Sequence, residues 1–351
     1  MSYFKTYQDA FLSESKHRAN TDFNKLCTYG IKPLDDCMLA INTNELIVIA
    51  AGSGIGKTEL ALAISRHNAL KGKKVAHYNL EGGFREAIQR MKWRDMIDEY
   101  FKTREIHDFL DFEYREWSLN RSPDKRLLDL EAKVYANLKD KLNNNLFFYD
   151  NPSGLNCDEF CASLLDFHDL KTAFENPANK SKGTGFNLDL IVIDHLHYFS
   201  LDKDENEINE ITRILKEAKK ITENLNIPVI LIAHLRKLPR EHGIPDKEDI
   251  YGTSNIHKIA NTCIIIAPDH ENDNHFEGIY PTHMRIAKSR IGLRPNISIY
   301  TSFDGHKRSY NESYDLYKIA PTGQPSPDPM CENERPKWYH GREVCPQDKP
   351  L

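Results

Sequence analysis

The residues with the clearest chemistry occupy one glycine-rich stretch, residues 51–58, which has the spacing Ala or Gly, four variable residues, then Gly-Lys-Thr. The apolar residues 46–50 before it are typical of a buried strand, and residues 59–65 after it have helix-forming composition. In a strand–loop–helix unit, glycines allow backbone N–H groups to surround phosphate oxygens, and the helix N-terminus adds the positive end of its dipole. The pattern predicts an ATP-binding loop made of Ala51, Gly52, Ser53, Gly54, Ile55, Gly56, Lys57 and Thr58.

Three residues are expected to hold the phosphates and a metal ion. Lys57 is expected to reach the β- and γ-phosphates, and the Thr58 hydroxyl is expected to hold Mg²⁺. Asp194 follows the apolar residues 190–193 and is expected to hold Mg²⁺ through water. The predicted cofactors are therefore ATP and Mg²⁺. The alternatives are a solvated Lys57 in an ordinary turn and an Asp194 that only caps a buried strand.

Two more polar residues follow predicted strands, and ligands of open α/β sheets bind at the carboxyl ends of the strands. Glu81 follows the strand predicted at 74–80 and is placed to activate the water that attacks the γ-phosphate. His234 follows the strand predicted at 228–233 and is placed to contact the γ-phosphate and respond to its loss. Acidic residues at strand ends are common, and His234 taken alone fits a buried structural histidine better.

A pair of cations, Lys288 and Arg290, alternates along a late predicted strand, so both side chains are expected on the same face. Two cations held together on a rigid hairpin suit a phosphate bound to a neighbouring subunit. The planar guanidinium of Arg290 is the better group for spreading charge from the γ-phosphoryl transition state. The alternative is an ordinary solvated pair on an edge strand.

Apolar strands that alternate with helical segments predict an α/β fold with a mostly parallel twisted sheet and helices on both faces. The last strands follow one another with little helix between them, which predicts an antiparallel edge hairpin. The predicted divisions of the chain are an N-terminal arm or linker helix at 1–24, an ATPase domain at 25–312 with a charged helical insertion at 93–145, and a proline-rich, disordered tail at 313–351.

Six short sequences add a resemblance to a known family. They are Tyr78-Asn-Leu-Glu81, Tyr149-Asp-Asn-Pro-Ser-Gly-Leu155, Ile193-Asp-His-Leu-His197, Ile232-Ala-His-Leu-Arg236, Asp249-Ile-Tyr-Gly-Thr-Ser-Asn-Ile256 and Arg285-Ile-Ala-Lys-Ser-Arg-Ile-Gly292. In this order they resemble the RecA-like P-loop motor domain of DnaB-type hexameric replicative helicases, over about residues 25–310. The resemblance implies that Glu81 is the catalytic base, that His234 is the γ-phosphate sensor, and that Arg290 is a finger donated to a neighbour's ATP.

The resemblance also implies that residues 249–256 form a DNA-contacting loop that lines a central channel. The candidate DNA-binding residues are Arg236, Lys237, Arg240, Tyr251, Gly252 and Thr253. Acidic residues dilute these cations, and the formal net charge of the chain is −5, so a single subunit is expected to bind DNA poorly. A ring with six copies is expected to hold a phosphate backbone. The alternative is a charged surface loop.

The sequence therefore predicts an ATP-hydrolysing helicase or translocase that acts on single-stranded DNA during replication. It is expected to form a homo-oligomer, a hexameric ring, through the aromatic-bearing arm at residues 3–11. Replication partner proteins are expected to bind residues 93–145 or the tail. Two alternatives stay open: a RecA-type recombination or repair ATPase that forms filaments on DNA, and a nucleotide-gated protein-interaction module.

Composition favours a soluble, intracellular protein, in the cytoplasm or in the replication compartment of a virus or organelle. The apolar runs are strand-sized, and the first residues lack a secretory signal, so no membrane partner is expected. Seven scattered cysteines, an odd number, fit a reducing compartment.

Overall fold

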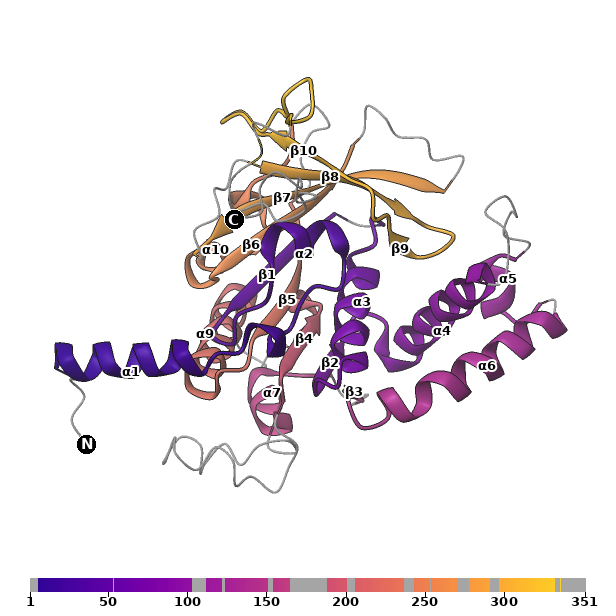
Figure 1. Cartoon of the computed structure of the whole chain (residues 1–351), viewed down its shortest axis with the longest axis horizontal. Helices are drawn as coiled ribbons and strands as arrows, with labels where there is room; N and C mark the ends of the chain where they lie inside the picture. The colour runs from indigo at the N-terminus through magenta and orange to yellow at the C-terminus, as the bar shows by residue number, and fades with distance from the viewer. Residues whose placement is uncertain are drawn as a thin grey trace, which may run out of the picture.

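One central sheet organises the computed structural model in Figure 1, with helices packed against it. The structure describes residues 6–52, 54–102, 112–121, 124–150, 154–164, 188–200, 206–236, 243–252, 254–269, 278–290, 297–331 and 335. The strands are β1 (Leu46–Ala51), β2 (Val75–Asn79), β3 (Leu146–Phe148), β4 (Leu190–Asp194), β5 (Val229–His234), β6 (Thr262–Pro268), β7 (Ile279–Ser289), β8 (Ile297–Asp304), β9 (Ser309–Tyr310) and β10 (Asp315–Lys318).

The sheet is mixed, and its order is β10-β8-β7-β6-β1-β5-β4-β2-β3, with β9 paired to β8. The strands from β6 through β1 to β3 run parallel, whereas β7, β8, β9 and β10 form antiparallel pairs. The parallel sheet with an antiparallel edge, as predicted from the sequence, is therefore confirmed.

Helices cover both faces of the sheet. They are α1 (Tyr7–Asn20), α2 (Lys32–Met38), α3 (Lys57–Leu70), α4 (Gly83–Lys102), α5 (Tyr114–Ser118), α6 (Lys125–Leu142), α7 (Cys157–Ser163), α9 (Glu207–Leu225) and α10 (Asn255–Ile259), with short 3₁₀ turns η1 (Phe23–Lys25), η4 (Leu196–Tyr198) and η5 (Lys247–Asp249). Alternate residues of β1 join two apolar clusters: Leu46, Val48 and Ala50 pack with α7 and α9, and Ile47 and Ile49 pack with α2 and α3. Because both faces of the central strands are buried, β1 is apolar throughout, and β4 and β5 are apolar up to their last residues.

The predicted insertion at residues 93–145 does not begin as a separate unit. Its first residue, Trp93, lies inside the continuous helix α4, is buried, and donates from its indole N–H to the carbonyl of His306 (2.9 Å). Helices α4 and α6 pack together and project from the body of the molecule (Figure 1). The boundary predicted at residue 93 therefore falls in the middle of a helix.

The tail predicted to be disordered from residue 313 begins as part of the sheet. Strand β10 pairs antiparallel with β8, and the side chain of Leu316 is buried in one of the two apolar clusters of the sheet. The backbone N–H of Met330 donates to the carbonyl of Leu316 (2.7 Å). The prediction of disorder is wrong for this part, because the prolines lie after or between short segments that still bury apolar side chains. Residues 332–334 and 336–351 lie outside the described residues.

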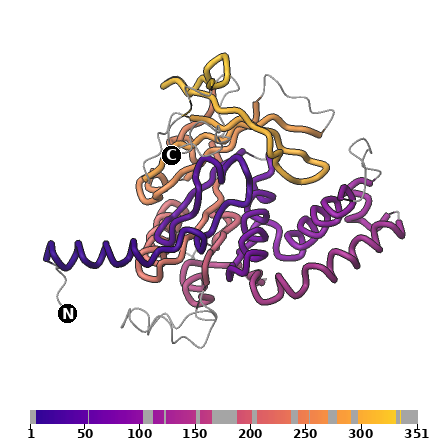
Figure 2. Tube along the Cα trace, viewed as in Figure 1, coloured from indigo at the N-terminus to yellow at the C-terminus, as the bar shows by residue number. Residues whose placement is uncertain are grey.

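The helix α1 extends away from the sheet, as the trace in Figure 2 also shows. None of its residues is buried, and Tyr7 is 83% exposed. The rings of Tyr7 and Phe11, one turn apart, lie 6.0 Å from each other between centroids. None of the helices in the described part of the chain combines the length and apolar composition that a membrane span requires.

Candidate functional site

The phosphate-binding loop leaves the carboxyl end of β1 and enters α3 at Lys57. Gly54 and Gly56 have φ angles of 82° and 81°, which favour glycine. A Cβ at Gly56 would lie 2.7 Å from the ring of Phe303, so there is no room for a side chain at this position. Ser53 lies outside the described residues. The described residues of the loop have the strand, the left-handed turns and the helix N-terminus that the sequence predicts.

A pocket of about 470 Å³ opens beside this loop. Its lining comes from the loop, the end of β2, the helix α4 and the antiparallel strands: Gly54, Gly56, Lys57, Thr58, Glu59, Asn79, Glu81, Gly82, Glu86, Arg90, Tyr280, Phe303, Gly305 and Arg308. The volume is in the range of ordinary small-molecule sites. The pocket therefore brings Lys57, Thr58 and Glu81 together, as predicted.

The register of the parallel strands places the other predicted residues at the same edge. Ala51 pairs with His234 across β1 and β5, and Asn79 pairs with Asp194 across β2 and β4. Glu81 lies two residues beyond Asn79. The three strand ends that carry Glu81, Asp194 and His234 thus follow one another on one side of the strand that carries the phosphate-binding loop.

Lys57 and Glu81 form an ion pair, with 2.9 Å between Nζ and Oε2. The lysine is buried and the carboxylate is partly open to solvent. Each group therefore satisfies the charge of the other.

The surroundings of Asp194 are those expected of a carboxylate that holds a cation. Its side chain is fully buried, and neither carboxylate oxygen has a hydrogen-bond partner among the described residues. Burial raises the pKa of Asp194 to about 6, while the nearby Thr58 hydroxyl and the charge of Lys57 lower it. The described residues contain no group of three His, Cys, Asp or Glu side chains arranged to hold a metal. A single carboxylate with a hydroxyl, phosphates and water is the donor set typical of Mg²⁺.

His234 lies in a cluster of three histidines. Its ring is 3.8 Å from that of His195 and 5.9 Å from that of His197, between centroids. Burial lowers the pKa of His195 to about 2 and also lowers the pKa of His197 and of His234. A neutral His234 offers phosphate a hydrogen bond rather than a positive charge. Sequence reasoning missed the contact of His234 with His195 and His197, although both lie within one quoted segment.

Lys288 and Arg290 lie at the amino ends of the neighbouring parallel strands, whereas the phosphate-binding loop lies at their carboxyl ends. Lys288 pairs with Cys263 near the start of β6, and Thr262 pairs with Ile47 near the start of β1. From Ile47 to Ala51 the strand advances about 13 Å, at about 3.3 Å per residue. The structure therefore does not bring either cation into the pocket of its own chain.

Both cations contact the end of α10. Lys288 Nζ donates to the carbonyls of His257 (2.6 Å) and Ala260 (2.7 Å), and Arg290 Nη2 donates to the carbonyl of Lys258 (3.4 Å). Cations suit these positions because the carbonyls at a helix C-terminus are otherwise unsatisfied. The contact of Arg290 is long, so its guanidinium is only weakly held.

The structure describes part of the predicted DNA-binding set. Arg236, Tyr251 and Gly252 are described, whereas Lys237, Arg240 and Thr253 lie outside the described residues. Arg236 is exposed, and its backbone N–H donates to the carbonyl of Asp249 (2.8 Å). The buried Arg285 donates to the carbonyl of Ile244 (3.0 Å) and pairs with Asp246 (3.1 Å). The segment before Tyr251 is therefore fixed to the sheet.

Sequence reasoning missed the charged wall of the pocket. The buried carboxylate of Glu59, next to Thr58, accepts from Arg90 Nη1 (2.6 Å) and from Arg308 Nε (2.7 Å). Arg90 comes from α4, and Arg308 follows β8 in a turn where its φ is 55°. The aromatic side of the pocket, Tyr280 and Phe303, was also missed. No local pattern marks these residues, because tertiary packing alone brings them to the loop.

Replacing Glu59 by glutamine is expected to lower the free energy of unfolding by about 3 kcal/mol, because two arginines lose the carboxylate they share in a largely buried site. Urea denaturation followed by circular dichroism measures this loss. The control is Glu131→Gln, whose partner Lys92 is exposed, so this pair is worth less than about 1 kcal/mol. If both variants lost the same free energy of unfolding, Glu59 would not be the shared partner that holds the two arginines.

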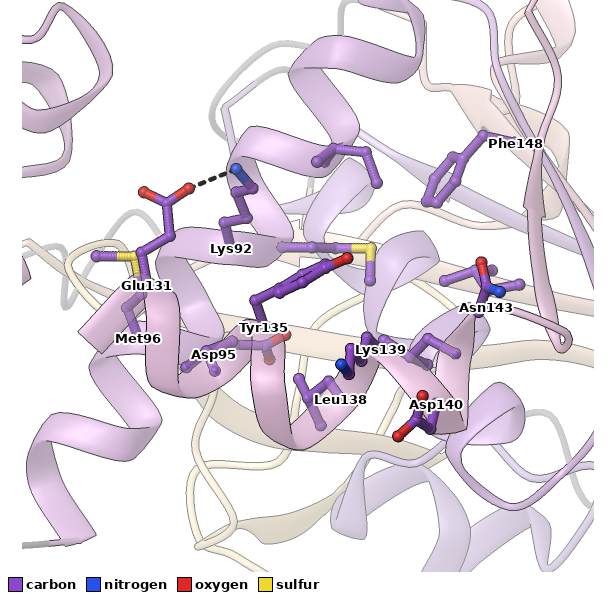
Figure 3. A pocket seen from close by; sticks show the side chains of 15 residues that line it. Lys92, Asp95, Met96, Glu131, Tyr135, Leu138, Lys139, Asp140, Asn143 and Phe148 are labelled. Carbon is purple, nitrogen blue, oxygen red and sulfur yellow. Dashed lines mark hydrogen bonds and ion pairs between the residues drawn. The ribbon is translucent and has the colours of Figure 1, made fainter. Parts of the chain in front are cut away.

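A second pocket, of about 510 Å³, lies between α4 and α6 (Figure 3). Its lining is mostly apolar and includes Met91, Met96 and Leu138, while the ion pair between Lys92 and Glu131 (2.5 Å) lies beside it. No residue of the phosphate-binding loop lines this pocket. It is therefore separate from the candidate ATP site.

A family model and several known proteins match this sequence. The family described as DnaB-like helicase C terminal domain matches residues 27–106 and 161–312. The replicative DNA helicase DnaC of Bacillus subtilis is 24% identical over 316 residues, which are 86% of this chain and 61% of that protein. The replicative DNA helicase DnaB of Haemophilus influenzae is 22% identical over 298 residues, 82% of this chain and 57% of that protein. The chain thus spans about 60% of the length of these relatives.

Solved structures with the same fold have low sequence identity. One solved ATPase domain is 17% identical with a TM-score of 0.65, and the match covers 88% of this chain and 98% of that one. A DnaB-like replicative helicase, solved in a study of its interactions with primase, is also 17% identical, with a TM-score of 0.62. That match covers 88% of this chain and 67% of the helicase. The RecA-like fold predicted from the sequence is confirmed.

Proposed function

Because the chain belongs to the DnaB-like helicase C terminal domain family, we propose that it is an ATP-driven helicase or translocase that acts on single-stranded DNA during replication. The main observation behind this proposal is that the candidate site residues are divided between the two opposite ends of the parallel strands. The phosphate-binding loop, Glu81 and Asp194 meet at one edge, and Lys288 and Arg290 lie at the other. Such a division suits an ATPase whose pocket is completed by a neighbouring copy.

Within one pocket, Lys57 exchanges Glu81 for the phosphates of ATP, and the α3 N-terminus stabilises their charge. Thr58 and Asp194 would hold Mg²⁺, which would neutralise charge on the phosphates. The freed Glu81 carboxylate accepts a proton from the attacking water. Neutral His234 donates a hydrogen bond to the γ-phosphate and loses that contact when phosphate leaves.

Arg290 is proposed to act on the ATP of a neighbouring copy. Its weak contact with the carbonyl of Lys258 is readily exchanged for a bidentate contact with phosphate oxygens. Lys288, in contrast, satisfies carbonyls at the end of α10 and holds the element that positions Arg290. Such head-to-tail contacts generate closed rings when the rotation between copies closes.

Assembly into a hexameric ring is proposed to use α1. Tyr7, Phe11 and Leu12 are exposed on a helix that buries none of its own residues. Packing of these neighbouring side chains against a second copy would remove their apolar surface from water, which is favourable. A replication partner protein is proposed to bind the helical block, where the pocket between α4 and α6 accepts apolar side chains (Figure 3).

The function is tested by the ATPase rate with and without single-stranded DNA across a salt series, on the chain of 351 residues, whose assembly is followed by light scattering. We expect a hexamer whose ATPase is stimulated by DNA, and whose stimulation declines as salt rises, because phosphate contacts release counterions. An ATPase that DNA does not stimulate at any salt concentration would contradict the proposal and favour a nucleotide-gated interaction module. Filaments rather than rings in electron micrographs would favour a recombination or repair ATPase.

A further inference from the structure

We propose that Arg308 contacts the bound nucleotide, and that Tyr114, in helix α5, positions the guanidinium for this contact. The inference rests on the proposed ATP site and deepens it. Helix α5 (Tyr114–Ser118) lies between residues 106 and 161, where the family match is interrupted, so the family likeness assigns it no role. Through these two side chains, a helix far from the phosphate-binding loop in the sequence becomes part of the nucleotide site.

Arg308 lines the pocket beside the phosphate-binding loop and keeps some of its hydrogen-bonding capacity. Its side chain is 16% exposed, and its Nε and Nη2 both contact Oε1 of Glu59, at 2.7 and 2.5 Å. The same oxygen accepts from Arg90, whose other carboxylate partner is Glu86. Within the described part of the chain, Nη1 of Arg308 has no hydrogen-bond partner. Because a guanidinium offers five N–H groups in a fixed fork, Nη1 is available to a polar or anionic group of a nucleotide in the pocket.

The ring of Tyr114 packs against the guanidinium of Arg308. The Cζ atom of Arg308 lies 4.2 Å from the centroid of this ring. The ring is itself fixed, because Trp93 meets it edge-on at 5.7 Å and Trp117 lies 6.0 Å away, between centroids. A cation over the face of an aromatic ring is attracted by the quadrupole of the ring. Tyr114 therefore restricts where the charge of Arg308 can lie.

The backbone of the turn that carries Arg308 is held from two sides. Its φ of 55° at Arg308 is uncommon for a residue other than glycine and persists only where the surrounding contacts determine it. On one side, the indole N–H of Trp93 in α4 donates to the carbonyl of His306 (2.9 Å). On the other side, the hydroxyl of Tyr310 donates to the carbonyl of Ile55 in the phosphate-binding loop (2.7 Å). The turn thus joins the helical block to the phosphate-binding loop.

The place of Arg308 in the pocket predicts an effect on nucleotide affinity rather than on the chemical step. Unlike Arg290, Arg308 lies in the pocket of its own chain, beside Glu59 and Thr58. A contact that is equally strong in the bound substrate and in the transition state lowers KM and leaves kcat unchanged. Removing the ring of Tyr114 frees the guanidinium to leave this position. We therefore expect weaker nucleotide binding with an unchanged kcat.

Isothermal titration calorimetry with the non-hydrolysable analogue AMP-PNP and Mg²⁺ measures affinity, and steady-state ATPase measures KM and kcat. Tyr114→Leu, which keeps the apolar bulk but loses the ring, is expected to raise Kd and KM about three- to thirtyfold, the range of a cation–π contact, with kcat unchanged. Tyr114→Phe retains the ring and should bind within about twofold of the unmodified protein. Arg115→Ala, at the next and exposed position of α5, is the matched control and should bind normally. Thermal unfolding followed by circular dichroism controls for folding.

A double variant shows whether Tyr114 acts through Arg308. Arg308→Ala is expected to raise Kd about tenfold or more. Adding Tyr114→Leu to it should change Kd by less than about twofold, because the ring then has no guanidinium to hold.

The outcomes separate this inference from the proposed function. If Tyr114→Leu binds AMP-PNP as tightly as the unmodified protein, or if Tyr114→Phe weakens binding equally, Tyr114 does not position Arg308. The same follows if the two changes add in the double variant, and an unchanged Kd for Arg308→Ala would show that Arg308 does not contact the nucleotide. In each of these cases the proposed function stands. If the unmodified protein binds no AMP-PNP, the proposed ATP site fails, and this inference fails with it.

Discussion

Replacing Arg290 by alanine is expected to lower the rate of ATP hydrolysis by about 10³- to 10⁵-fold, the range observed for arginine fingers, while ATP binding persists. The guanidinium stabilises charge only as the γ-phosphoryl group is transferred, so its loss affects the transition state rather than the bound substrate. The fold should tolerate the change, because the guanidinium of Arg290 makes one long described hydrogen bond, to the carbonyl of Lys258, and the backbone bond to Asn261 is kept.

The measurement is steady-state ATPase together with titration of a fluorescent ATP analogue. Arg290→Lys keeps the charge but loses the planar fork, so it should recover only part of the rate. Arg115→Ala, on the exposed surface of α5, is the matched control and should hydrolyse ATP at the normal rate. Full-rate hydrolysis by Arg290→Ala would show that Arg290 is not the finger.

Replacing Glu81 by glutamine is expected to lower hydrolysis by about 10²- to 10⁴-fold, the usual effect of a general base. Nucleotide binding should be retained or strengthened, because the amide no longer competes with the phosphates for Lys57, which pairs with Glu81 at 2.9 Å. If Glu81 only supported the shape of the pocket, its replacement would instead weaken nucleotide binding.

The same two assays distinguish these possibilities, with Glu131→Gln between α4 and α6 as a matched control outside the ATP pocket. A Glu81→Gln chain that binds ATP tightly and hydrolyses it slowly agrees with the role of base. A Glu81→Gln chain that fails to bind ATP, or that hydrolyses ATP at the normal rate, would contradict the role of Glu81 as the base.

The residues at the carboxyl ends of the strands were predictable from sequence because each follows a strand-sized segment, which is continuously apolar before Asp194 and before His234. In a parallel sheet the ends of neighbouring strands meet at one edge, so the positions of Glu81, Asp194 and His234 in the chain nearly determine their positions in space. The register of β2 with β4 and of β1 with β5 agrees with this expectation.

The rest of the pocket was not predictable in this way. Arg90 lies on the long helix α4, and Arg308 lies in a turn after β8, so only tertiary packing brings both to Glu59. The strand β10 was missed for a different reason: prolines after it suggested disorder, but Leu316 buries its side chain against the sheet. In both cases long-range burial outweighs the local pattern.

The central claim is that each ATP pocket is completed by a cation from the neighbouring copy, and mixing two inactive chains tests it most directly. Arg290→Ala keeps an intact phosphate-binding loop, and Lys57→Ala keeps an intact Arg290. In rings assembled from an equal mixture, about a quarter of the interfaces join an intact loop to an intact finger. Steady-state ATPase of the mixture should therefore rise well above that of either chain alone. If the mixture is as inactive as its components, although co-purification through a tag on one variant shows that the rings are mixed, the pocket is not shared between copies.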